Sequence, residues 1–402
     1  MHTAVVTGDS HQGSRLFLVT LSLLAAATFW STALVEILAG ACLLTGIVVT
    51  LKVFRSDRDA VHPPLLFRLL LVLWCLYLVL VVVSFFVSRV PNLGPDRLAG
   101  FWHALMFPLL LIVPFDIDRI AQPLRVFGTS AAVASLAAIV RFALEHPREL
   151  QALFIGDTTF DCLVSVAAIL ATGHLAYLLK KPGNRARSKL VIAIVGLSAC
   201  LTAIGFSTRK GPILAAGIGG MILLLLADRR FAIGFAGLAG LILLVAPPLL
   251  HQKIVWFFTG RPIERYDLWR AGFSLLNDLP LFGYGPGSYR AILPAGVPVS
   301  THVASWHNDF LQTILESGWL AGALYAALVG AILLTTIRWA VSPVAPTERI
   351  VRLTVLLVLG VQVAFSFTNA IVSSPALGTV WWGTLAIVLR CSQTFPTERQ
   401  TP

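Results

Sequence analysis

The sequence predicts an all-α polytopic membrane protein with about twelve transmembrane helices, and composition and hydropathy are the observations that predict it. The 402 residues are 57% hydrophobic and only 12% charged, whereas charged residues make up about a quarter of a soluble protein. Mean hydropathy is +0.84. Apolar stretches of about 17 to 25 residues recur along the chain, and each is long enough to cross a hydrocarbon core about 30 Å thick.

Polar or charged segments separate most of these stretches, so the individual spans can be placed. We predict them at 16–33, 34–54, 65–88, 97–114, 123–144, 161–179, 189–206, 211–227, 231–250, 310–337, 351–371 and 376–390. The chain shows no internal repeat or low-complexity tract. We therefore expect one transmembrane domain over residues 1–402, interrupted by a long polar segment at 251–309. That segment is too long for a simple connector and too polar to cross a bilayer, which is typical of a functional extramembrane loop between helices 9 and 10.

Lysine and arginine counts predict the orientation of the chain, because these residues accumulate on the cytoplasmic side. With all twelve spans and a cytoplasmic N-terminus, 19 of the 30 basic residues lie inside. The 11 on the other side are Arg89, Arg97, Arg141, Arg148, Arg209, Lys210, Lys253, Arg261, Arg265, Arg270 and Arg290. The bias places both termini in the cytoplasm and the long loop outside. The pI near 9.9 then indicates contact with anionic membrane lipid and no nucleic-acid partner.

Seven of the outer basic residues gather in two places, the Arg209-Lys210 pair and the long loop. Positive charge on the translocated side works against the topology bias, so its concentration there suggests a use. Arginine suits phosphate oxygens, which favours an anionic ligand. Alternatively, these side chains extend to the interface or pair with acidic neighbours in the loop. Charge placement alone leaves both interpretations open.

Four polar motifs follow one another between residues 206 and 318. They are Phe206-Ser207-Thr208-Arg209-Lys210-Gly211-Pro212, Arg265-Tyr266-Asp267-Leu268-Trp269, Pro280-Leu281-Phe282-Gly283-Tyr284-Gly285-Pro286-Gly287, and His307-Asn308-Asp309-Phe310-Leu311-Gln312 with Glu316-Ser317-Gly318. In this order they resemble the O-antigen ligase family, whose members carry S-T-R, R-x-x-x-W, P-L-x-G-x-G and H-N-x-x-L-Q-x-x-x-E-x-G.

The resemblance implies a GT-C-like glycosyltransferase of the bacterial inner membrane, with about twelve helices and an active site facing the periplasm. Its donor would be a polyprenyl-pyrophosphate-linked glycan, and in the ligase branch the acceptor is lipid A–core. An O-antigen polymerase, which joins two lipid-linked glycans, remains open within the family. A protein O-oligosaccharyltransferase and a transporter of lipid-linked sugars are further alternatives, although a transporter needs charge along a path through the membrane.

The resemblance also assigns residues. Arg209 and Arg265 match the arginines that bind the donor pyrophosphate, and His307 matches the essential histidine of the loop. Arg261 lies four residues before Arg265 and would share its helical face, so we add it as a second phosphate contact. Lys210 is a candidate supporting residue beside Arg209.

The expected chemistry is consistent with these residue types. A departing pyrophosphate needs a metal ion or fixed cations, and the outer segments contain no DxD, DxxD or His/Asp cluster. We therefore expect arginine to serve and no metal or other cofactor. The five cysteines show no CxxC or Cys/His spacing, so neither a disulfide framework nor a zinc site is expected. A histidine with a reference pKa near ~6.5 can take the acceptor proton, and direct displacement would invert the anomeric configuration.

Several roles stay open at the level of the sequence. His307 could instead cap the helix that begins near Asn308, and His302 is an alternative base. Asp309 and Glu316 could orient the histidine, act as the base or be structural. The glycines at 283, 285 and 287 could form a phosphate loop or a tight turn. Residues 310–318 are expected to continue helically into the tenth span.

Overall fold

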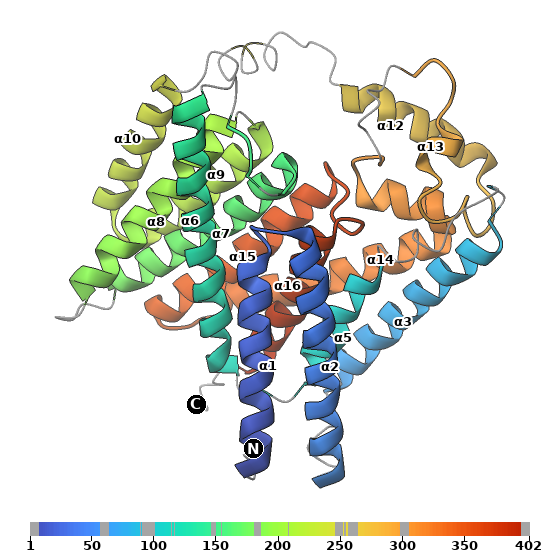
Figure 1. Ribbon diagram of the computed structural model, residues 1–402, viewed down its shortest axis with the longest axis horizontal. Helices are drawn as coiled ribbons and strands as arrows, with labels where there is room; N and C mark the ends of the chain where they lie inside the picture. The colour runs from blue at the N-terminus through green and yellow to red at the C-terminus, as the bar shows by residue number, and fades with distance from the viewer. Residues whose placement is uncertain are drawn as a thin grey trace.

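The computed structural model describes residues 8–56, 64–88, 90, 101–113, 115, 117–145, 150–153, 155–180, 186–207, 209–245, 252, 255, 264–297 and 305–394. Within these residues the regular structure is entirely helical and no strand occurs. Figure 1 shows the arrangement.

A helix occupies each of the predicted apolar stretches. The long helices are α1 (Gly8–Ala27), α2 (Thr32–Ser56), α3 (Leu65–Phe86), α6 (Ala121–Glu145), α7 (Asp157–Lys180), α8 (Ala186–Ser207), α9 (Lys210–Ala227), α10 (Arg229–Val245), α14 (Asp309–Val341), α15 (Pro346–Ser366) and α16 (Pro375–Thr394). The shorter elements are η2 (Trp102–Leu105), α5 (Met106–Ile112), η3 (Ile117–Ile120), α12 (Glu264–Ser274), η4 (Leu275–Asp278) and α13 (Tyr289–Ile292). The predicted fourth span at 97–114 is helical only from 102 to 112 within the described residues.

The chain is a polytopic membrane protein. In the part of the chain that the structure describes, 8 helices are long and apolar enough to cross a bilayer, namely α2, α3, α6, α7, α8, α9, α14 and α15. Two shorter apolar helices span Ser14–Ala27 and Trp102–Ile112. Large apolar side chains such as Leu44, Ile192 and Leu334 point outward from these helices, which is what a lipid-facing surface requires.

Helix packing brings distant parts of the chain together at one end of the bundle. α7 packs against α8, α9 and α15, while α3 lies along α14. In Figure 1, α6 to α10 form one side of the molecule, and α3 and α14 form the other. α15 and α16 lie between them, and α12 and α13 sit beside the first part of α14. The turn between α15 and α16 therefore lies between α7 and α9 on one side and α12 on the other.

The first part of α14 differs from the prediction of one continuous helix. Gly318 has φ 85° and ψ 167°, which is not helical, so the prediction of helical continuity is wrong at this residue. In an unbroken helix the carbonyls of Leu315 and Glu316 would accept from residues four positions later. They accept instead from the amides of Tyr284 and Gly285, at 2.8 and 2.9 Å. The break thus docks the Pro280–Gly287 segment onto α14.

The glycine series forms a tight turn against this break. Gly283 has φ 72°, and its amide donates to the Pro280 carbonyl at 2.8 Å. A Cβ atom on Gly283 would lie 2.6 Å from the backbone of Glu316. Because the amides of Tyr284 and Gly285 already bond to α14, the structure supports the tight turn over the phosphate loop.

We expect Gly283→Ala to lower the free energy of unfolding by about 2–4 kcal/mol, because an L side chain there meets both left-handed strain and a backbone clash. Denaturant unfolding of the purified protein in detergent measures this loss. The control is Gly296→Ala, which has φ +87° but no atom within 4 Å of the added Cβ. It should lose only the strain contribution of about 1–2 kcal/mol. Equal losses in the two variants would contradict the docking of this turn.

Candidate functional site

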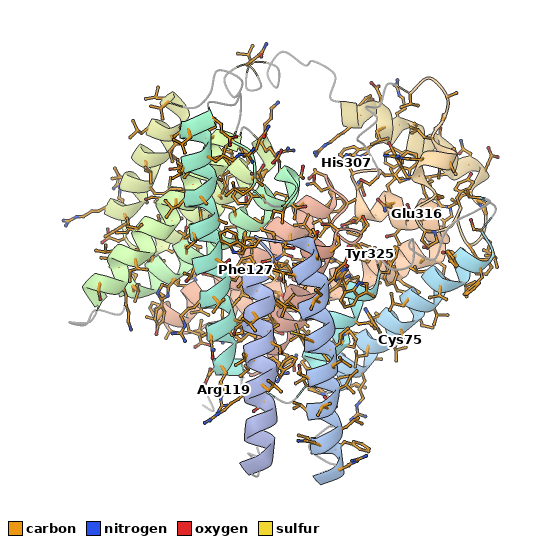
Figure 2. The ribbon with its side chains drawn as sticks, in the orientation of Figure 1. Cys75, Arg119, Phe127, His307, Glu316 and Tyr325 are labelled. Carbon is orange, nitrogen blue, oxygen red and sulfur yellow. The ribbon has the colours of Figure 1, made fainter. Side chains whose placement is uncertain are left out.

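The candidate residues come from separate segments that meet at the α12 end of the bundle. Arg209 lies between α8 and α9, Arg265 in the first turn of α12, and His307 just before α14. The α15–α16 turn lies between them. Figure 2 shows His307 beside α12, away from Arg119 at the other end of the bundle.

Arg209 is held by the first turn of α7. Its Nε lies 2.8 Å from Oδ2 of Asp161, and its Nη1 donates to Oγ1 of Thr158 at 2.8 Å. Asp157 is more distant, at 4.0 Å. The Asp161 side chain is 1% exposed, whereas the Arg209 side chain is 32% exposed. A buried carboxylate therefore fixes the guanidinium while part of its surface stays accessible to a ligand.

Arg265 is anchored on the turn between α15 and α16. Its Nη1 donates to the Thr368 carbonyl at 2.6 Å, and its Nη2 donates to Oδ1 of Asn369 at 3.5 Å. Burial and the positive charge of Arg209 lower the pKa of Arg265. The two guanidinium groups are thus close enough to repel each other, an arrangement that a bound anion would relieve.

The R-x-x-x-W motif holds the histidine segment through its tryptophan. Trp269 lies one helical turn after Arg265, and its Nε1 donates to the Trp306 carbonyl at 2.9 Å. The Trp306 ring is fully buried and meets the Tyr289 ring edge to face at 5.0 Å. Arg265 thus links α12 to the α15–α16 turn, and Trp269 links α12 to Trp306, the residue before His307.

His307 itself has an unusual backbone and electrostatic environment. Its φ of 50° is the only positive value at a non-glycine residue in the described part of the chain, and such strained residues cluster at functional sites. Burial, followed by the charges of Arg265 and Arg209, lowers the pKa of His307 to about 4. The imidazole is therefore neutral at neutral pH, and all three residues lie within electrostatic reach of one another.

The helix-capping role belongs to a neighbour of His307. Oδ1 of Asn308 accepts a hydrogen bond from the Leu311 amide at 2.9 Å, which is a side-chain N-cap of α14. His307 is therefore not needed to cap the helix. Arg261 and His302 lie outside the described residues, and Lys210 is the half-buried first residue of α9.

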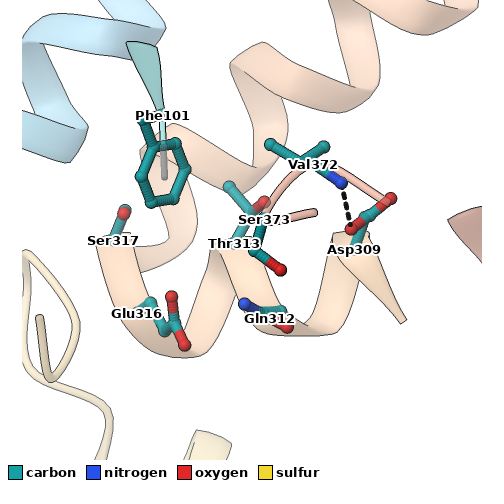
Figure 3. Close-up of a pocket in the computed structure, with 8 residues that line it drawn as sticks. All are labelled: Phe101, Asp309, Gln312, Thr313, Glu316, Ser317, Val372 and Ser373. Atoms are coloured by element: carbon teal, nitrogen blue, oxygen red, sulfur yellow. Dashed lines mark hydrogen bonds between the residues drawn. The ribbon is translucent and has the colours of Figure 1, made fainter. Parts of the chain in front are cut away.

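A small polar cavity lies along α14 directly after His307 (Figure 3). Its volume is about 10 Å³, and it is lined by Phe101, Asp309, Gln312, Thr313, Glu316, Ser317, Val372 and Ser373. Oδ1 of the buried Asp309 accepts a hydrogen bond from the Val372 amide at 3.2 Å. Asp309 thus ties the start of α14 to the turn that also holds Arg265, while Glu316 is buried deeper along the same face.

Sequence reasoning missed three partners of the two arginines. Asp161 and Thr158 come from α7, and the Thr368 carbonyl comes from a turn more than a hundred residues after Arg265. A signal for Asp161 did exist, because a carboxylate at the end of an apolar span is a functional candidate. The Thr368 carbonyl has no signal in the sequence, since any residue supplies one.

Comparison with known proteins bears on the same region. Residues 192–326 match the family model described as O-antigen ligase. The match runs from α8 into α14, so it includes Arg209, Arg265 and His307. No curated protein matches the chain. The resemblance expected from the four motifs is therefore confirmed over these residues.

We expect Asp161→Asn to lower the free energy of unfolding by about 1.5–3 kcal/mol, because it removes the charge that bonds Arg209 in a buried position. Thermal and denaturant unfolding in detergent measure this change. Asp157→Asn is the matched control on the same helix. Asp157 lies 4.0 Å from Arg209 and its partner, the Ala152 amide, can still bond to an asparagine oxygen. The control should therefore lose less than about 1 kcal/mol. A control that loses as much as Asp161→Asn would contradict the assigned anchor.

Proposed function

We propose that this chain, which carries an O-antigen ligase domain over residues 192–326, transfers a glycan from a polyprenyl-pyrophosphate donor to a hydroxyl of a lipid A–core acceptor. The family supports ligase-type transferase activity on lipid-linked glycans in general. The proposal that the arginines bind pyrophosphate and that His307 takes the acceptor proton rests on one observation. Arg265 and Arg209 lie close enough to His307 to disfavour its protonation.

The proposed setting is the bacterial inner membrane, with about twelve spans in one domain and residues 251–309 as a periplasmic loop. The distribution of basic residues supports this orientation, as does the presence of a helix in every predicted apolar stretch. α12 and α13 lie at the end of the bundle opposite the start of α1 in Figure 1. The reaction would accordingly take place at the outer membrane surface.

Arg209 and Arg265 are proposed to bind the pyrophosphate. Guanidinium groups form paired, charge-assisted hydrogen bonds with phosphate oxygens, and fixed cations stabilise the negative charge that grows on a leaving group. Arg261 would add a second contact from the same segment as Arg265, and Lys210 would add positive charge beside Arg209. Under this proposal the reaction needs no metal ion.

His307 is proposed as the general base. As the acceptor oxygen forms its bond to the anomeric carbon, the bond from that carbon to the pyrophosphate oxygen breaks and the pyrophosphate leaves with the electron pair. The acceptor proton passes to the imidazole, and the anomeric configuration inverts. Asp309 and Glu316 would support the site by holding α14 and the α15–α16 turn in place.

Donor binding would also prepare this base. Burial, followed by the charges of Arg265 and Arg209, lowers the pKa of His307 to about 4, which makes the imidazole a weak base. Pyrophosphate bound between Arg209 and Arg265 offsets their repulsion of a protonated imidazole. The pKa of His307 therefore rises in the donor complex, which brings it closer to the working pH, where a general base is most effective.

We expect the purified protein to transfer glycan to lipid A–core in the presence of chelator, and His307→Ala to lower turnover by about 10²–10⁴. Arg265→Ala should lower kcat/KM by about 10²–10³, because leaving-group stabilisation is lost. Arg270→Ala is the control on the same helix, since Arg270 is exposed and its guanidinium stacks on Tyr266. It should remain near wild type.

Three outcomes of this assay would change the conclusion. Full turnover by His307→Ala in folded protein removes His307 as the base. Loss of wild-type activity in chelator contradicts metal independence. A product that joins two lipid-linked glycans identifies the polymerase alternative.

We expect kcat/KM and kcat to begin to fall at different pH values as the pH is lowered. The value of kcat/KM for the donor reports the donor-free protein, in which His307 is unprotonated above about pH 4. This kcat/KM should therefore stay constant as the pH is lowered from 8 to about 5. kcat reports the donor complex, in which the raised pKa should start the decline at a higher pH. Steady-state rates between pH 4 and 8 measure both limbs. Arg265→Gln should shift the kcat/KM limb upward, and Arg270→Ala should not. If kcat/KM and kcat of the wild type fall at the same pH, donor binding does not raise the pKa of His307.

A further inference from the structure

The two arginines of the candidate site differ in the charge of the groups that hold them. Arg209 bonds to the buried carboxylate of Asp161 at 2.8 Å. Arg265 bonds to two neutral oxygens, the Thr368 carbonyl at 2.6 Å and Oδ1 of Asn369 at 3.5 Å. Within the residues that the structure describes, Arg265 forms no ion pair with an aspartate or glutamate. These contacts therefore hold Arg265 without opposing its charge.

A positive charge held in this way lowers the stability of the protein. Arg265 is half-buried, and burial together with the positive charge of Arg209 lowers its pKa. Removing a charge from water costs free energy unless an opposite charge compensates. An aspartate at position 369 would supply that charge, but the chain has an asparagine there. Such a loss of stability is typical of a site whose ligand brings the missing charge.

The Asn369 side chain is fixed where it meets the guanidinium. Asn369 is only 7% exposed, and its Nδ2 donates to Oγ1 of Thr368 at 3.2 Å. This bond directs the other end of the amide, Oδ1, towards Arg265. The same turn is held against α14 by the Phe367 ring, which stacks on the Phe310 ring with their centres 4.5 Å apart. The turn thus presents a fixed, neutral oxygen to the guanidinium.

The neutral contacts use only part of the guanidinium group. Nη1 and Nη2 of Arg265 each donate to the α15–α16 turn, and a guanidinium carries further N–H donors on these atoms and on Nε. Such donors form paired hydrogen bonds with phosphate oxygens. A guanidinium held by neutral groups also attracts an anion more strongly than one already bonded to a carboxylate. Arg265 is therefore better suited than Arg209 to recognise an anion by its charge.

We propose that Asn369 is a positioning residue that holds Arg265 without neutralising it, so that the whole charge of Arg265 acts on the donor's pyrophosphate. The inference rests on the proposed function, because it takes the arginines as the pyrophosphate site. Asn369 acts through Arg265 and needs no contact with the ligand. The amide at position 369 then sets the affinity for the anion, whereas the Thr368 carbonyl sets the direction of the guanidinium.

The test replaces the amide with a carboxylate of the same shape. Asn369→Asp places a negative charge beside Arg265, and calorimetric titration of full-length protein in nanodiscs with inorganic pyrophosphate measures the effect. We expect the Kd to rise by about tenfold or more, because the new carboxylate offsets the charge of Arg265 and repels the anion. The stability of the ligand-free protein against denaturant should stay the same or increase, because the carboxylate pairs with a half-buried guanidinium.

Two controls separate charge from structure. Asn369→Ser removes the amide without adding charge, so it should raise the Kd by no more than about threefold, through the loss of one long hydrogen bond. Asn277→Asp adds the same charge at an exposed position on η4 and should keep the wild-type Kd. A purely structural role of Asn369 would lower stability and affinity together, whereas the proposal requires Asn369→Asp to lower affinity alone.

Several results would overturn the proposal. These are a wild-type Kd in Asn369→Asp, equal weakening by Asn369→Asp and Asn369→Ser, failure of Asn369→Asp to fold, and absence of pyrophosphate binding by the wild type. Absence of glycan transfer by a wild type that binds pyrophosphate overturns the proposed function instead. The two failures are therefore distinguishable.

Discussion

The break of α14 at Gly318 is the constraint on which the site depends. A helix that continued unbroken would use the carbonyls of Leu315 and Glu316 internally. Because the break leaves them available, they bind the Tyr284 and Gly285 amides and fix one end of the segment that carries α12. Further attachments of that segment include the Trp269 bond to Trp306, the Arg265 bond to Thr368 and the bond from the Ser88 hydroxyl to the Tyr284 carbonyl. Leu268, Ala271 and Tyr289 of the segment also pack with Trp306, Leu311 and Leu315 in a small apolar cluster. Hydrogen bonds and apolar contacts together therefore hold the segment against α14.

Electrostatics then gives the site its chemical character. Two guanidinium groups are kept near each other by partners on opposite sides, Asp161 for Arg209 and the Thr368 carbonyl for Arg265. Burial is the main reason that the pKa of His307 is low, and the positive charges of Arg265 and Arg209 disfavour its protonation further. This concentration of positive charge is the property on which the proposed binding of pyrophosphate rests.

The turn between α15 and α16 connects the parts of the candidate site. Its Thr368 carbonyl accepts a hydrogen bond from Arg265, and its Val372 amide donates to Oδ1 of Asp309 at the start of α14. α15 also packs against α7, the helix whose Asp161 holds Arg209. A movement of this turn would therefore shift Arg265 and the start of α14 together.

The sequence by itself determined the helical membrane class, the positions of the apolar helices and the family of residues 192–326. Length and hydropathy are local properties, and they suffice because a bilayer requires long apolar helices whatever their neighbours. Motif order also singled out Arg209, Arg265 and His307. Only the tertiary structure decided that these three residues converge, that Asn308 and not His307 caps α14, and that α14 breaks at Gly318. Those outcomes depend on contacts between segments far apart in the chain, such as Arg265 with Thr368, which are more than a hundred residues apart. A backbone carbonyl that takes part in such a contact cannot be recognised in the sequence.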